Sequence, residues 1–151
     1  MNKVLYIILI SLFSLTIISC AKKSSDDSKT TTSSVSFVAV GTSGTLLTSS
    51  DGTSWTSRTS GTSNGLQRVI YANSTFVTVG ISGTFLTSSD GTTWTSRTSG
   101  TTNNLYGVTY GNSTLVAVGD SGTILTSSDG TSWTSRTSGI TNRLWEVTYK
   151  E

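Results

Sequence analysis

The sequence predicts an all-β fold built from small four-stranded antiparallel sheets, and three observations support this prediction. A unit of 39 residues recurs almost unchanged, starting at Phe37, Phe76 and Leu115. Each unit contains short runs of alternating apolar and polar residues, separated by Gly, Asn, Ser and Asp at intervals too short for a helix. Each unit also carries one tryptophan at the same place: Trp55, Trp94 and Trp133. A fixed period of this length is typical of repeat architectures, in which neighbouring copies bury each other's apolar faces.

One unit accommodates four strands, named A to D in chain order. In the middle unit we expect A over residues 66–71, B over 75–79, C over 84–88 and D over 93–98. The glycines between B, C and D supply the positive φ that tight turns require. The tyrosines of strand A keep the phase of the repeat and are expected in the core: Tyr71, Tyr110 and Tyr149. A four-stranded meander of about 40 residues is the blade of a β-propeller.

The phase of the repeat predicts how the array is completed. The first unit starts with a strand B over residues 35–40, and the last predicted strand, 144–149, is a strand A. Pairing these two strands in one sheet gives three blade equivalents with a strand-swapped closure, which removes exposed sheet edges. Closed propellers usually have about four to eight blades. Three arrangements therefore remain open: a strained closed monomer, a homodimer that forms a six-bladed ring, and an open arc or remnant of a longer array.

The N-terminal residues predict export. An apolar run over residues 4–18 is shorter than the roughly 20 residues that a transmembrane helix needs. The run leads to Cys20 in a segment that resembles the bacterial lipobox, which implies a lipoprotein signal peptide over residues 1–19 and lipidation of Cys20. In lipoproteins of two-membrane bacteria, Ala21 after the cysteine implies delivery to the outer membrane. A free cysteine without a role and a thiol that pairs with another chain are the alternatives.

Residues 20–34 are predicted to be the lipidated cysteine and a flexible tether. After the cysteine, this stretch holds no aromatic and no branched aliphatic residue, so it cannot bury enough apolar area to offset the entropy of ordering. The repeat domain then spans residues 35–151. Its repeats are 37–75, 76–114 and 115–151.

The charge of the chain argues against a nucleic-acid ligand. The formal net charge is +2, but from residue 35 onward six basic and six acidic residues cancel. A basic surface for nucleic acid is therefore not predicted. The chain also lacks histidine and has no unique acid–tyrosine pair. We therefore predict no catalytic residue, no metal site and no cofactor.

A second repeated feature is the motif SSDGTSW at residues 49–55, which recurs with one change at 88–94 and unchanged at 127–133. Its aspartate can accept backbone N–H groups of its own turn, its glycine allows the left-handed step, and its tryptophan can cover the hairpin. The aspartates could instead be metal ligands or general acids. However, a catalytic residue need occur only once, whereas a structural residue recurs in each blade. The residues interpreted as structural are Asp51, Gly52, Trp55, Asp90, Gly91, Trp94, Asp129, Gly130 and Trp133.

This motif resembles the Asp-box or BNR repeat, in the shorter variant in which Asp and Gly are adjacent. Together with the strand sequences FVTVG at 76–80, GTFLTS at 83–88 and LYGVTY at 105–110, it is similar to the β-propeller family of the photosystem II assembly factor and its relatives in bacterial envelopes. The resemblance covers residues 35–149. It implies the propeller fold but no particular ligand, since one fold hosts many activities.

Three arginines also recur in phase, on strand D: Arg58, Arg97 and Arg136. A sialidase needs three arginines that converge from different blade positions onto one carboxylate. Identical positions on separate blades cannot converge in this way. A sialidase-like hydrolase fragment is therefore the least favoured alternative.

Residues that differ between the copies gather at one end of the predicted array. In an up-and-down blade, the B–C and D–A connections lie at the same end, and there the copies carry different side chains. Aromatic rings beside acids and amides suit recognition of a protein or a glycan. Neutral drift after duplication would produce similar differences. The candidate binding rim consists of Asn104, Tyr106, Asp120, Arg143, Trp145 and Glu146.

The sequence therefore favours a non-enzymatic binding or assembly module, anchored by lipid in the bacterial cell envelope and recognising protein or glycan. The main alternative is a ligand-free remnant of a contracted repeat array. Neither reading identifies the ligand.

Overall fold

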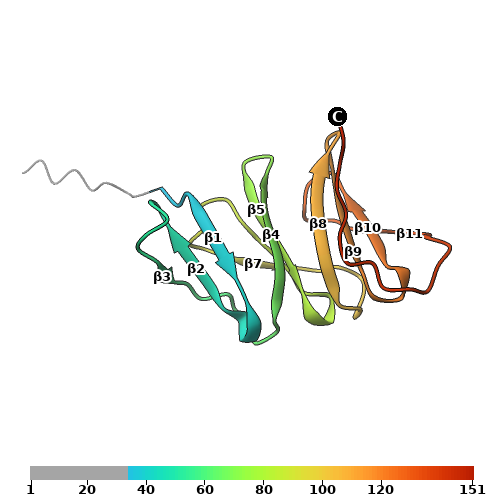
Figure 1. Ribbon diagram of the computed structural model, residues 1–151, viewed down its shortest axis with the longest axis horizontal. Coiled ribbons are helices and arrows are strands. Elements are labelled where there is room, and N and C mark those ends of the chain that lie inside the picture. The colour runs from blue at the N-terminus through green and yellow to red at the C-terminus, as the bar shows by residue number, and fades with distance from the viewer. Residues whose placement is uncertain (1–33) are drawn as a thin grey trace, which may run out of the picture. The chain divides into compact units, whose positions relative to one another are not determined.

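The computed structural model describes residues 34–151. The predicted signal peptide, Cys20 and the tether up to residue 33 lie outside the described residues. The described part forms three antiparallel sheets that follow one another along the chain (Figure 1). No helix within residues 34–151 is long and apolar enough to cross a membrane. The predicted all-β, propeller-type fold is confirmed.

The three sheets are called the first, second and third blade. The first contains β1 (Phe37–Val40), β2 (Leu46–Ser49) and β3 (Thr56–Ser57). The second contains β4 (Leu66–Ala72), β5 (Thr75–Gly80), β6 (Phe85–Ser88) and β7 (Thr95–Arg97). The third contains β8 (Leu105–Gly111), β9 (Thr114–Gly119), β10 (Ile124–Ser127) and β11 (Thr134–Arg136). Consecutive strands pair within each blade, so each is a simple meander.

The turns follow from local sequence. The β4–β5 hairpin turns at Asn73 and Ser74, both with positive φ, which matches the twist of two-residue hairpins. A short 3-10 turn joins β1 to β2, β5 to β6 and β9 to β10. These turns are η1 (Thr42–Gly44), η2 (Ile81–Gly83) and η3 (Asp120–Gly122). The glycine that ends each turn has positive φ. In Gly83, an added Cβ would collide with the carbonyl oxygen of Thr101, so the turn needs glycine for space as well as for φ.

The core lies between neighbouring blades. β1 packs beside β4, and β4 beside β8. Phe85 and Val79 of the second blade are fully buried in one cluster with Leu105 and Val108 of the third. A second cluster joins Leu46 of the first blade to the second blade. Blades therefore stabilise one another by burying apolar side chains between sheets, as expected for a repeat array.

The tryptophans take part in this packing unequally. Trp133 packs against Phe85 of the second blade, and Trp94 packs against the cluster that contains Leu46 of the first blade. Each of these half-buried indoles therefore contacts the preceding blade. Trp55 belongs to the first blade and is 44% exposed. For this residue the predicted cover over the hairpin is only partial, because no blade precedes the first one within the described residues.

The expected closure within one chain is not formed. Among residues 34–151, β1 pairs with β2 alone, and residues 144–149 form no strand. This last segment runs beside β8, where the backbone of Glu146 lies close to Gly107. The N–H of Leu144 donates to the carbonyl of Gly119, at the end of β9, at 2.9 Å. A closed three-blade ring would require a turn of about 120° between sheets that pack roughly 10 Å apart. The described chain is therefore an open arc of blades, and the closed monomer was a wrong alternative.

The tyrosines of strand A are less buried than the sequence suggested. Tyr71 is 61% exposed and Tyr149 is 46% exposed, whereas Tyr110 packs against the core between the second and third blades. Tyr71 is at the turn end of its hairpin, where its ring packs on Phe76 with 4.6 Å between centroids. A regular repeat phase places a residue on one face but does not supply the neighbour that buries it.

Candidate functional site

The candidate site is centred on Asp120, the first residue of η3. It lies on the edge of the arc at which the 3-10 turns of all three blades are found. The Asn104 side-chain amide donates to Asp120 Oδ2 at 2.9 Å, and the Tyr106 hydroxyl donates to the same oxygen at 3.2 Å. Arg143 Nε donates to Asp120 Oδ1 in an ion pair. Four of the six predicted rim residues therefore meet on one carboxylate.

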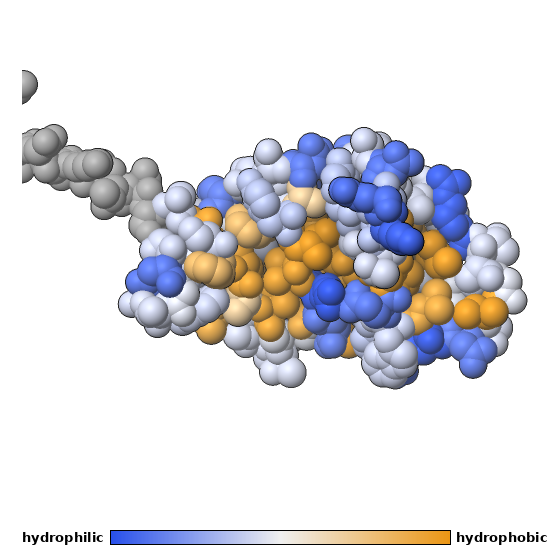
Figure 2. All heavy atoms as spheres, turned by 45° about the horizontal axis from the view of Figure 1, so that its top comes forward, coloured by the Kyte–Doolittle hydropathy of each residue, from blue (hydrophilic) through white to orange (hydrophobic). Residues whose placement is uncertain are grey.

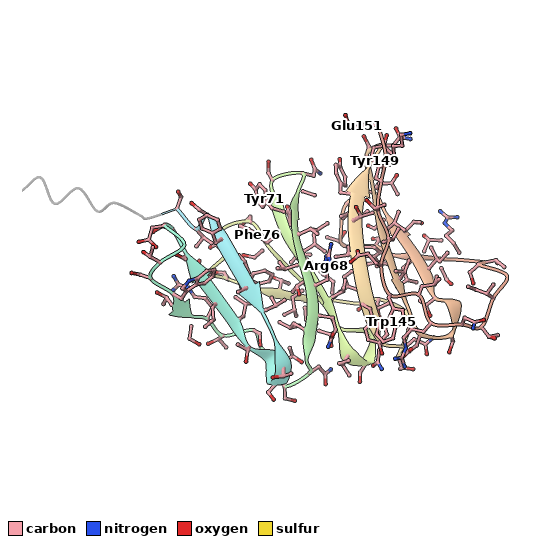
Figure 3. The ribbon with its side chains drawn as sticks, viewed as in Figure 1. Arg68, Tyr71, Phe76, Trp145, Tyr149 and Glu151 are labelled. Atoms are coloured by element: carbon pink, nitrogen blue, oxygen red, sulfur yellow. The ribbon has the colours of Figure 1, made fainter. Side chains whose placement is uncertain are left out.

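An aromatic stack completes the cluster. The rings of Tyr106 and Trp145 lie 4.8 Å apart and are tilted by 45°. The Arg143 guanidinium lies 5.0 Å from the centroid of Tyr106 and 4.6 Å from that of Trp145, so it makes cation–π contacts with both. Trp145 remains 62% exposed. Figure 3 places its side chain at the end of the arc opposite Tyr71 and Tyr149. The exposed ring of Trp145 thus lies beside polar groups whose positions are fixed by hydrogen bonds.

The local backbone holds Asp120 in place. Its N–H donates to the Asn104 carbonyl at 2.9 Å, and its own carbonyl accepts the N–H of Thr123 at 3.0 Å. The Asn104 side-chain oxygen in turn accepts the N–H of Ser82, in η2 of the second blade, at 2.9 Å. The cluster is therefore tied to two blades, which limits its freedom to rearrange when a ligand arrives.

The charges of the cluster compensate each other. The hydrogen bond from Arg143 is the main cause that holds the pKa of Asp120 below its usual range. The same bond raises the pKa of Arg143. Both groups are consequently ionised at neutral pH and form a pair with no net charge. The site offers hydrogen-bond donors, acceptors and aromatic surface, but no uncompensated charge for an ionic ligand.

A shallow pocket of about 490 Å³ opens at this cluster. It is lined by Asn103, Asp120, Ser121, Thr141, Arg143 and Trp145. A larger pocket of about 750 Å³ lies on the second blade, lined mainly by Ser, Thr and Gly that recur in the other copies. The smaller pocket is lined by Asp120, Arg143 and Trp145, which differ from their counterparts in the other copies of the repeat. We therefore consider it the better candidate despite its smaller volume.

The remaining rim candidate, Glu146, does not join the cluster. It follows Trp145 in an extended segment, so its side chain points to the opposite face. There its carboxylate forms a salt bridge with Arg68 of β4, with 2.6 Å between Oε2 and Nη1. The sequence candidates did not include Arg68. The signal was present, since residues 68, 107 and 146 occupy one repeat position as Arg, Gly and Glu.

The aspartates of the repeated motif lie in their own turns. Asp90 Oδ1 accepts the N–H groups of Thr92 and Thr93 at 2.8 Å each, and the Ser88 hydroxyl at 2.9 Å. The same bonds form around Asp51 and Asp129. These bonds, led by the one from the backbone of Thr93, hold the pKa of Asp90 well below its usual range. Such a carboxylate is a fixed acceptor for its turn and not a proton donor near neutral pH.

The recurring arginines also bond within their own blades. Arg58, Arg97 and Arg136 each donate Nε to a threonine hydroxyl on the adjacent strand at 2.9 Å. The three guanidinium groups do not converge on a common point through these bonds. Within residues 34–151, no group of three or more metal-ligating side chains is placed to hold a metal ion.

Comparison with known proteins finds a solved structure with a similar fold. No protein-family model and no curated protein matches the chain. A solved structure, "YCF48 bound to D1 peptide", superimposes with a TM-score of 0.56 at 21% sequence identity. The match covers 65% of this chain and 34% of that one, so this chain spans about a third of that protein's length. At this identity the likeness concerns the fold: the chain has the fold of a β-propeller sector.

Proposed function

We propose that this chain is a non-enzymatic binding module that recognises a polypeptide segment through the cluster around Asp120. One observation carries the proposal: Asn104, Tyr106 and Arg143, which differ from their counterparts in the other repeats, all bond Asp120. Trp145 packs on Tyr106 and Arg143 beside them.

The chemistry of the cluster suits a ligand without strong net charge. Since Asp120 and Arg143 neutralise each other, recognition would depend on hydrogen bonds and on contact with the exposed ring of Trp145. Backbone amides and apolar side chains of an extended polypeptide provide both. The structural neighbour was solved with a bound peptide, which makes a protein ligand the first choice for this fold. A neutral glycan stacked on Trp145 is the alternative that the test must separate.

We also propose that the module is held at a membrane by lipid on Cys20, with the tether over residues 20–34 as spacer, in the bacterial cell envelope and at the outer membrane. Two or three acyl chains, at about 0.8 kcal/mol per buried methylene, give a stable anchor. Replacing Cys20 by serine should move the protein from the membrane fraction to the soluble fraction. Membrane association that survives Cys20→Ser would refute lipid anchoring.

The binding proposal is tested by probing the full chain against an array of short peptides and, separately, an array of neutral glycans. For any probe bound, Trp145→Ala should weaken binding at least about tenfold, the loss of one exposed aromatic anchor. The matched control is Gln67→Ala, at the same repeat position in the second blade. It should leave binding unchanged.

The outcomes separate the alternatives. Peptide binding that is lost only in Trp145→Ala supports the proposal. Glycan binding that is lost only in Trp145→Ala would show that the ligand is a sugar and not a polypeptide. Binding that is equally strong in Trp145→Ala moves the site elsewhere. Absence of binding on both arrays favours the ligand-free remnant. A fluorogenic sialoside panel should show no turnover, and turnover would revive the hydrolase alternative.

A further inference from the structure

The first blade and the segment after the third blade expose surfaces that fit each other. This fit follows from a comparison of equivalent repeat positions. The described chain has two blade interfaces, built from equivalent repeat positions, so the partner that each exposed position lacks can be identified from its counterparts. The first blade presents the bare edge of β1, and the other end presents residues 144–149.

The strand edge supplies the first match. β4 pairs with β5 in a register that places Ile70 opposite Val77, and the third blade repeats this register. The same repeat positions in residues 144–149 and in β1 are Thr148 and Val38. The segment 144–149 already lies where the first strand of a next blade belongs, because the Leu144 N–H donates to Gly119 as the Leu66 N–H donates to Gly41.

Burial agrees with a missing strand. The core positions of β5 and β9 are mostly buried, whereas the corresponding side chains of β1 are only half-buried or exposed. Phe37 is 49% exposed, although its counterpart Phe76 is buried. Figure 2 shows hydrophobic side chains gathered on one face over the first and second blades. In the second blade Phe76 is covered by Tyr71, as Figure 3 shows. Tyr149 holds the same repeat position as Tyr71.

The tryptophans supply the second match. Trp133 packs on Phe85 of the preceding blade, and Trp94 packs against the cluster of Leu46, which holds the same repeat position as Phe85. The next residue at that position is Ile124, half-buried on the third blade. The indole that lacks a preceding blade is Trp55. Ile124 is therefore the surface that Trp55 lacks.

Charge supplies the third match. Arg68, Gly107 and Glu146 hold one repeat position on consecutive first strands, and Arg68 reaches past Gly107 to bond Glu146. If residues 144–149 of one copy joined the first blade of another, Glu146 would lie one blade away from Arg68 of the second copy. Acidic and basic groups would then alternate around the channel, with no like charges on neighbouring blades.

We propose that two copies of this chain associate head to tail into a six-bladed ring, in which residues 144–149 of each copy pair with β1 of the other. The register is the one seen in β4–β5, with Tyr149 opposite Phe37 and Thr148 opposite Val38. A twofold axis makes the two junctions identical and closes the ring. Six blades lie within the usual range of about four to eight.

The test uses disulfide cross-linking of the full chain in membranes of the cells that express it. Facing residues of an antiparallel pair have Cα atoms about 4.5–5.5 Å apart, within disulfide reach. The variant Val38→Cys/Thr148→Cys should therefore give a covalent dimer on a non-reducing gel after mild oxidation. The control pair Val38→Cys/Lys150→Cys is two residues out of register and should give little dimer. Each single-cysteine variant controls for Cys20.

The band pattern decides the matter. A covalent dimer in the first pair alone supports the ring. A monomer band with both introduced thiols consumed would mean closure of the chain on itself, and a ladder of higher oligomers would mean an open fibre. Either result, or equal cross-linking in the control pair, overturns the proposal. So does a monomer band whose thiols remain free.

A second variant tests the tryptophan junction without cysteines. Trp55→Glu alters a side chain that is 44% exposed and packs on no preceding blade in the single chain, so the blades should still fold, as circular dichroism can verify. The charge would be buried against Ile124 of the second copy, and light scattering of the detergent-extracted full chain should show the dimer mass reduced to that of a monomer. Trp55→Phe should keep the dimer. A folded Trp55→Glu protein that remains dimeric contradicts the proposed ring.

Discussion

The ring of Trp133 lies over the ring of Phe85 from the preceding blade, with 4.0 Å between centroids and 30° between planes. Phe85 is fully buried by this contact and its neighbours. Trp133 of the repeated motif therefore stabilises the junction with the sheet before it. Trp55 occupies the same repeat position and has no such junction within the described residues.

Trp133→Ala should lower the free energy of unfolding by about 2–4 kcal/mol, because it removes a large half-buried ring from between two sheets. Trp55→Ala should lower it by about 1 kcal/mol or less at low protein concentration, since this exposed side chain packs on no preceding blade. Chemical denaturation followed by far-ultraviolet circular dichroism measures both. Equal effects of the two substitutions would show that the tryptophans act only within their own turns. If two copies associate, the effect of Trp55→Ala should grow with protein concentration.

The variants Gly83→Ala and Gly100→Ala separate the effect of steric crowding from the effect of backbone conformation on stability. Both glycines have positive φ, of 67° and 76°. A Cβ on Gly83 would collide with the Thr101 carbonyl, whereas nothing lies within 4 Å of a Cβ on Gly100. Gly100→Ala should therefore cost only the conformational penalty of about 1 kcal/mol. Gly83→Ala should cost more than about 3 kcal/mol. Similar unfolding midpoints for the two variants would contradict the crowding in η2.

Acid should destabilise the blades through the aspartates of the repeated motif. Backbone N–H groups hold the pKa of Asp51, Asp90 and Asp129 below their unfolded value of about 3.9. A lowered folded pKa adds stability that is complete above the unfolded pKa and is lost as the pH falls toward the folded pKa. The denaturant concentration at the midpoint of unfolding should thus decrease as the pH is lowered from about 6 to about 3. Asp90→Asn should reduce this dependence, and an unchanged pH profile would show that its bonds add no stability.

The Arg68–Glu146 salt bridge should contribute little to stability. Both side chains are about half exposed, and exposed ion pairs usually contribute about 0.2–1 kcal/mol. A double-mutant cycle with Arg68→Ala and Glu146→Ala should give a coupling in this range. The coupling should decrease when salt is added. A coupling that salt does not alter would indicate that the pair is shielded from solvent.

The repeat in the sequence determined the fold class because it reports local preferences. The strand periodicity predicted the strands of the second blade to within two residues at each end, and the Asp-Gly-rich motif predicted a turn between the third and fourth strands. Both follow from backbone and side-chain interactions between residues close in the chain. Position in the repeat also predicted that Asp120 and Arg143 share one end of the array, because strand direction decides at which end each loop lies.

Only the tertiary structure decided which of these residues touch and which are buried. Trp55 and Trp133 have the same local sequence, yet Trp55 is 44% exposed whereas Trp133 packs on Phe85 of the preceding blade. Glu146 stands beside Trp145 in the sequence, but it pairs with Arg68 on the other face of the segment. Residues 144–149 carry the pattern of a strand but form none, since a strand needs a partner edge. Local sequence determines the conformation that each unit prefers, whereas burial and pairing depend on which surface lies opposite, a relation between residues distant in the chain.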